Sequence, residues 1–158
     1  MELIFIFKLI HLVGASVLFG TGLGIAFFML MAHRSGHAGV IAVTARFVVV
    51  ANLVFIATAV VVEPLSGMAL AWAIGLSPGD ESWIVYSFVL YGLVGLCWLP
   101  VVFIQIRMRK LAQDAAVNAK PLPPEYHRLF RIWFALGWPA FAGVIAIFAL
   151  MIWQPHFW

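Results

Sequence analysis

The stretch Lys8-Leu-Ile-His11-Leu-Val-Gly14 opens an apolar segment that runs on to Ala32. About 20 apolar residues carry an α-helix across a bilayer, so this segment predicts a membrane helix. Lys8 and His11 are three residues apart, which places both on one face of that helix. An ionisable side chain inside a membrane helix is costly and by default marks a functional site. We therefore expect the rest of the chain to give His11 a buried position.

The composition assigns the whole chain to a membrane. Of its 158 residues, 65% are hydrophobic and only 9% are charged, and the mean hydropathy is +1.10. A soluble domain carries roughly 25% charged residues, so this chain cannot cover a surface that faces water. We predict an all-α fold, in which residues 1–158 form a single integral membrane domain, an antiparallel bundle of four transmembrane helices.

Interruptions of the apolar pattern give the helix ranges as about 3–32, 40–75, 83–113 and 126–154. The first helix is expected to be retained, because Glu2 stands where a signal peptide has basic residues. Glycines and charges predict a solvated loop over His33–Gly39. The spacing of His33 and His37 would suit a metal pair on a helix, but this loop offers no third ligand. Proline removes a backbone donor, so we expect the second helix to kink near Pro64.

The second helix carries a polar stripe that should face the interior of the bundle. Asn52 and Glu63 are eleven residues apart, which is three helical turns, so they share one face. The same face carries Ile56, Ala59 and Ser66. Polar side chains in a membrane helix avoid lipid, and this stripe is therefore predicted to point inward.

Basic residues are restricted to two of the connections. Arg34 and Arg46 flank the first, and the connection between the third and fourth helices carries Arg107, Arg109, Lys110, Lys120, Arg128 and Arg131. The positive-inside rule puts both in the cytoplasm, with both termini on the periplasmic side of a bacterial inner membrane. The net charge of +3 is then a feature of membrane orientation, and no nucleic-acid partner is expected.

The helical rise places His11 and Glu63 at one level in the outer half of the bilayer, with Lys8 one turn further out. In one interpretation, Lys8 and His11 are only packing partners of the buried Glu63, as in a non-enzymatic structural or accessory membrane subunit. In another, His11 is a metal ligand that binds the iron of haem b, with Met68 or His156 as its sixth ligand. A third interpretation is a proton or small-solute relay through Glu63 and His11.

The candidate cofactor-binding residues are accordingly His11, Lys8, Glu63 and Met68, and the candidate metal ligand is His11. The glycines of the first helix, Gly20, Gly22 and Gly24, favour close helix packing or leave room for a flat ligand. The partners expected are the lipid bilayer and either further copies in a homo-oligomer or a partner membrane subunit.

Several motifs carry a family resemblance. Lys8-x-x-His11, followed by His33, resembles the first helix of the HemJ-type protoporphyrinogen IX oxidases, and the run from Thr58 to Leu70 resembles the end of their second helix. Pro139 and the closing Gln154-Pro155 are similar to their final helix. The chain resembles more closely a bacterial family of predicted four-helix integral membrane proteins with no assigned function. Its motifs are found here as Lys8/His11, Pro64/Gly67 and Leu136 to Pro139.

The resemblance to HemJ-type proteins implies a four-helix membrane protein that binds haem b, with His11 as the ligand. That family has a functional lysine in its third helix. No lysine stands between Trp83 and Ile106 in this sequence. The resemblance therefore implies haem binding with a redox role more directly than it implies the oxidation of protoporphyrinogen IX.

Overall fold

The computed structural model describes residues 2–155, and these residues are helical apart from short connections. The elements are α1 (Glu2–Ser35), α2 (Ala38–Ala51), the π-helix η1 (Asn52–Ile56), α3 (Ala57–Ala73), α4 (Ser82–Val117) and α5 (Pro124–Trp153). Because α2, η1 and α3 form one continuous helix, the described part of the chain has four helices long and apolar enough to cross a membrane. The predicted all-α four-helix fold is confirmed, and the helix ends differ from the predicted ranges by one to four residues.

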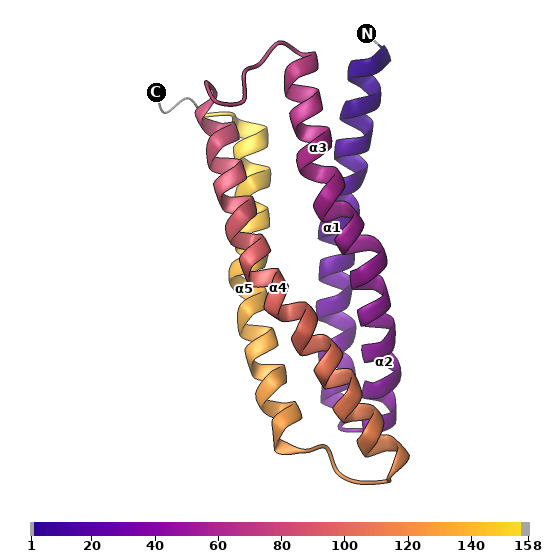
Figure 1. Cartoon of the computed structure of the whole chain (residues 1–158). Helices are drawn as coiled ribbons and strands as arrows, with labels where there is room; N and C mark the ends of the chain where they lie inside the picture. Colours follow the sequence, from indigo (N-terminus) through magenta and orange to yellow (C-terminus); the bar gives the residue numbers. More distant parts are fainter. Residues whose placement is uncertain (1, 156–158) are drawn as a thin grey trace.

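The four long helices run antiparallel (Figure 1). The start of α1, the end of α5 and the α3–α4 connection lie at one end of the bundle, which we call the terminal end. The α1–α2 and α4–α5 connections lie at the opposite end, which we call the basic end. α4 pairs with α5, α1 packs on α2 and α3, and α2 packs on α4, whereas α1 and α5 touch little. The bundle therefore consists of two helix pairs that are joined mainly through α2 and α4.

The best-buried hydrophobic side chains lie toward the basic end. Those at most 1% exposed include Met29 of α1, Ile41 of α2, Met108 and Ala112 of α4, and Tyr126 of α5. All four long helices thus contribute to this core. Elsewhere many leucine, valine and phenylalanine side chains are exposed, which suits a surface in contact with lipid rather than water.

The α1–α2 connection is shorter than predicted, and the prediction of a solvated loop over His33–Gly39 was wrong at both of its ends. α1 continues to Ser35 and α2 begins at Ala38. His33 lies in the last turn of α1, where its ring stacks on Phe130 of α5 with centroids 3.6 Å apart. Its Nδ1 also lies 3.3 Å from the hydroxyl of Tyr126. We attribute the longer α1 to the packing of its last helical turn against α5. The connection between α1 and α2 is then formed by Gly36 and His37 alone.

The second long helix continues through Pro64, and its irregular turns lie earlier, in η1. Proline has no N–H, so the carbonyl of Val60, four residues before Pro64, loses its usual helical donor. The hydroxyl of Tyr91 in α4 donates to that carbonyl at 2.7 Å. The hydrogen bond that Pro64 removes from α3 is thereby replaced by one that ties α3 to α4.

The polar stripe of this helix faces the interior, as predicted. Its members Asn52, Ile56, Ala59, Glu63 and Ser66 are all buried. Asn52, at the start of η1, donates through Nδ2 to Oε1 of Gln105 in α4. Its Oδ1 accepts a hydrogen bond from Nε1 of Trp98 at 2.9 Å. These bonds join η1 to α4 in the middle of the apolar span, where polar groups have no water to pair with.

Candidate functional site

His11 of α1 and Glu63 of α3 meet where these two helices pack together. Nδ1 of His11 lies 3.3 Å from Oε2 of Glu63, 3.1 Å from Oγ of Ser66 and 3.2 Å from the backbone carbonyl of Glu63. The backbone carbonyl can only accept, and so can the carboxyl group of Glu63 when it is ionised, so this geometry requires a proton on Nδ1. The Ser66 hydroxyl donates in turn to the Glu63 carbonyl at 3.2 Å. One imidazole N–H thus bridges the two helices.

Two glycines allow this close approach. A Cβ atom at Gly67 would lie 2.9 Å from Cε1 of His11, and a Cβ atom at Gly14 would collide with Oε1 of Glu63. A side chain at either position would force the carboxyl group or the imidazole to shift. We call the group formed by His11, Gly14, Glu63, Ser66 and Gly67 the His11–Glu63 cluster.

Burial gives the cluster its electrostatic character. Glu63 is 8% exposed, and the side chain of His11 is 16% exposed. Oε2 of Glu63 faces the imidazole, whereas Oε1 is buried and has no hydrogen-bond partner within residues 2–155. A lone carboxylate in an apolar interior is very costly, and the contact with His11 offsets part of the cost of burying Glu63.

The structure brings two of the four candidate cofactor-binding residues into direct contact. Lys8 is exposed, one turn before His11, and the ion-pair contact of Glu63 is made by His11. Met68 is half-buried on α3 beside Gly67. His156, the other candidate sixth ligand, lies outside the described residues.

Side chains that commonly bind metals are not clustered in the part of the chain that the structure describes. Among residues 2–155, no three His, Cys, Asp or Glu side chains are grouped closely enough to bind a metal ion. His37, the second member of the rejected metal pair, is exposed at the start of α2. His11 and Glu63 therefore form a pair that no third such side chain joins within the described residues.

Sequence reasoning missed the part played by Gly14 and Gly67. A signal was present, because Gly14 follows His11 by three residues and Gly67 follows Glu63 by four. Such spacings place each glycine on the same helix face as the ionisable residue before it. The hydrogen bond from Tyr91 to the Val60 carbonyl has no signal in the residues next to Tyr91.

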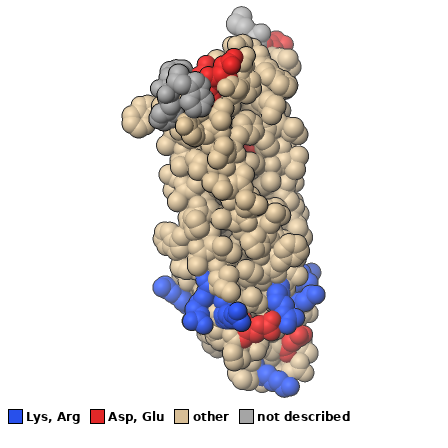
Figure 2. All heavy atoms as spheres, turned by 60° about the vertical axis from the view of Figure 1, so that its left-hand side comes forward, with Lys and Arg blue, Asp and Glu red and all other residues tan. Residues whose placement is uncertain are grey.

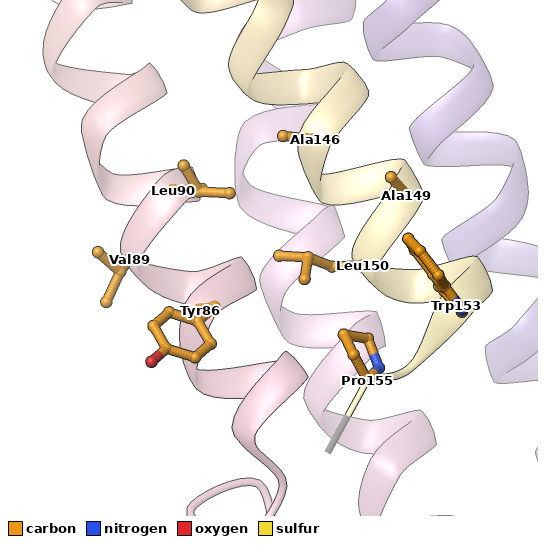
Figure 3. Close-up of a pocket in the computed structure, with 8 residues that line it drawn as sticks. All are labelled: Tyr86, Val89, Leu90, Ala146, Ala149, Leu150, Trp153 and Pro155. Carbon is orange, nitrogen blue, oxygen red and sulfur yellow. The ribbon is translucent and has the colours of Figure 1, made fainter. Parts of the chain in front are cut away.

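The protein also has an apolar hollow, which is separate from the His11–Glu63 cluster. Figure 3 shows an apolar hollow near the terminal end of α4 and α5, lined by Tyr86, Val89, Leu90, Ala146, Ala149, Leu150, Trp153 and Pro155. Beside it, the hydroxyl of Ser82 donates to the carbonyl of Pro155 at 3.0 Å, which fastens the end of α5 to the start of α4. None of the cluster residues lines this hollow.

Replacing Gly67 by alanine tests the close approach. The added methyl group would push the imidazole away from its acceptors, and we expect Gly67→Ala to lower the free energy of unfolding by about 1–3 kcal/mol. Gly22→Ala is the matched control, because a Cβ there meets nothing within 4 Å and alanine is the better helix former. Thermal unfolding of the detergent-purified variants gives the comparison. Equal unfolding temperatures for Gly67→Ala and Gly22→Ala would show that the glycine is not required.

The chain matches one family of known proteins over nearly its whole length. Residues 5–155 match the model of a family described as "Predicted integral membrane protein (DUF2269)". Searches of the curated proteins and of the solved structures found no match. The matched range contains the His11–Glu63 cluster and nearly the whole of the four long helices. The predicted membership of a membrane protein family without an assigned function is thereby confirmed: the chain is a multi-pass integral membrane protein that belongs to the DUF2269 family.

Proposed function

We propose that this protein binds haem b through His11 and has a redox role. One observation carries the proposal: Nδ1 of His11 is engaged by Glu63 and Ser66, which leaves Nε2 as the nitrogen available to a metal. Histidines that ligate metals almost always donate their other ring N–H to a carboxylate or a carbonyl. Imidazole is also an ordinary axial ligand of haem iron.

The residues around His11 fit such a role. Glu63 and Ser66 hold the proton on Nδ1 and fix the plane of the ring against Gly67, which orients Nε2. A bound haem would supply one-electron chemistry at this level of the membrane. Lys8, one turn toward the terminal end, would offer a cation to a porphyrin carboxylate, and Met68 on α3 is the candidate sixth ligand.

The similarity of Lys8-x-x-His11 to HemJ-type proteins supports the same assignment. Because the third long helix has no lysine between Trp83 and Ile106, we propose haem binding without the oxidase activity of that family. A transfer of electrons to or from another membrane component would need only the haem and its ligand.

The alternative is a non-enzymatic structural or accessory subunit, in which the cluster only joins α1 to α3. The tight fit of His11 against Gly67 and of Glu63 against Gly14 favours this reading. Every contact of the cluster then serves helix packing. The two proposals differ in whether Nε2 of His11 has a ligand to bind.

A visible absorption spectrum of the detergent-purified protein separates them. The haem proposal predicts a Soret band that His11→Ala abolishes, because the iron loses its protein ligand. His37→Ala is the control, since it removes an exposed histidine far from the cluster. A colourless preparation that is stably folded, expressed in cells that make haem, would remove the haem proposal and leave the structural one.

We also propose that both termini face the periplasmic side of a bacterial inner membrane. The support is the charge distribution: eight of the nine Lys and Arg residues lie at the basic end, part of which is the blue belt of Figure 2. Short flanking segments rich in Lys and Arg stay on the cytoplasmic side.

Cysteine labelling tests this orientation. In a Cys97→Ala background, Ser77→Cys places a thiol in the α3–α4 connection, and Val117→Cys places one at the basic end. We expect a membrane-impermeant maleimide added to intact spheroplasts to label position 77 and to spare position 117 until the cells are lysed. Labelling of position 117 alone would reverse the assignment.

A further inference from the structure

The basic end carries a large excess of positive charge. Its basic residues are Arg34, Arg46, Arg107, Arg109, Lys110, Lys120, Arg128 and Arg131. Only two acidic residues, Asp114 and Glu125, lie at this end, so six positive charges are in excess. On the face shown in Figure 2, most of the blue side chains form a belt across the helices above their tip, and a further blue group lies at the tip itself.

Several of the basic residues lie well inside the helices, at a distance from the helix ends that face the cytoplasm. Arg46 lies eight residues into α2 and Arg131 lies seven residues into α5. At 1.5 Å per residue, these positions are about 12 Å and 10 Å from the helix starts. Arg109 is eight residues, or about 12 Å, from the end of α4. The basic side chains therefore flank the apolar spans at the level of the lipid headgroups.

Most of these charges have no acidic partner among residues 2–155. Arg107 makes a two-pronged contact with Glu125, in which Nε and a terminal nitrogen donate at 2.8 and 3.1 Å. Arg34, Arg46, Lys110, Arg128 and Arg131 are exposed, which leaves them open to anions from outside the chain.

Arg109 differs from the other basic residues. It is only partly exposed, and its Nε is buried without a hydrogen-bond partner in the described part of the chain. A buried donor without a partner costs about 1–3 kcal/mol. An acceptor supplied from outside the chain, at the level of the headgroups, would remove that cost.

We propose that this belt is a binding surface for anionic phospholipids, with Arg109 as the anchor of a headgroup phosphate. The guanidinium fork matches a phosphate group in two-pronged geometry, and Nε is one of its donors. Basic residues next to membrane spans attract anionic lipids, at about 1 kcal/mol for each Lys or Arg. A soluble polyanion such as RNA would reach the tip of the helices but not the sides that carry Arg46 and Arg131.

Titration of the purified protein with phosphatidylglycerol and, separately, with phosphatidylcholine tests the proposal, with native mass spectrometry as the readout. We expect phosphatidylglycerol to bind several-fold more tightly. Arg109→Gln should weaken its binding roughly fivefold, the equivalent of one lost charge contact, and Arg128→Gln with Arg131→Gln should weaken it further. Lys8→Gln is the matched control, because it removes the same charge at the terminal end.

Two further measurements keep the test decisive if Arg109→Gln folds poorly. Circular dichroism checks the helix content of each variant, and Arg109→Lys retains the charge but loses the fork, so that it should show an intermediate affinity. Equal affinities for the two lipids, or an equal loss in Lys8→Gln and Arg109→Gln, would overturn the proposal. So would displacement of the lipid by an equimolar amount of inorganic phosphate or of a short RNA.

Discussion

A carboxyl group in the hydrocarbon of a bilayer must find its partners inside the protein, because lipid offers none. Glu63 meets this constraint through the Nδ1–H of His11, and the contact fixes how α3 lies against α1. Glycine at positions 14 and 67 suits the same contact, since a side chain there would displace the carboxyl group or the imidazole. The environment of His11, and with it any ligand bound at Nε2, therefore depends on one short contact between two helices.

The same constraint explains the other polar groups of the apolar spans. The carbonyl that Pro64 leaves without a helical donor is satisfied by Tyr91, and Asn52 is satisfied by Gln105 and Trp98. Each of these bonds leads from the second long helix to α4, so they join the two helix pairs. At the basic end, apolar side chains such as Met29 and Met108 form the core instead. Packing is thus concentrated at one end, and the His11–Glu63 cluster lies toward the other.

The parts of this structure that depend on local sequence could be predicted. Hydropathy predicted the four long helices, and helical periodicity predicted the inward face that contains Asn52 and Glu63. Both patterns depend only on residues that are close together in the sequence. The contacts between helices could not be obtained in this way. The fit of Gly14 against Glu63, the bond from Tyr91 to Val60 and the stacking of His33 on Phe130 depend on which helices become neighbours. Lys8 was grouped with His11 by spacing, but a long lysine chain near a helix end can turn toward the surface, and it is exposed.

The claim on which the account depends is that His11 and Glu63 interact across α1 and α3. A double-mutant cycle of His11→Ala and Glu63→Gln, measured as the free energy of unfolding in mixed micelles without added haem, tests it directly. If the two side chains interact, the coupling energy is expected to be about 1 kcal/mol or more, toward the upper part of the range for polar pairs between membrane helices. Two effects that simply add, within about 0.3 kcal/mol, would contradict it.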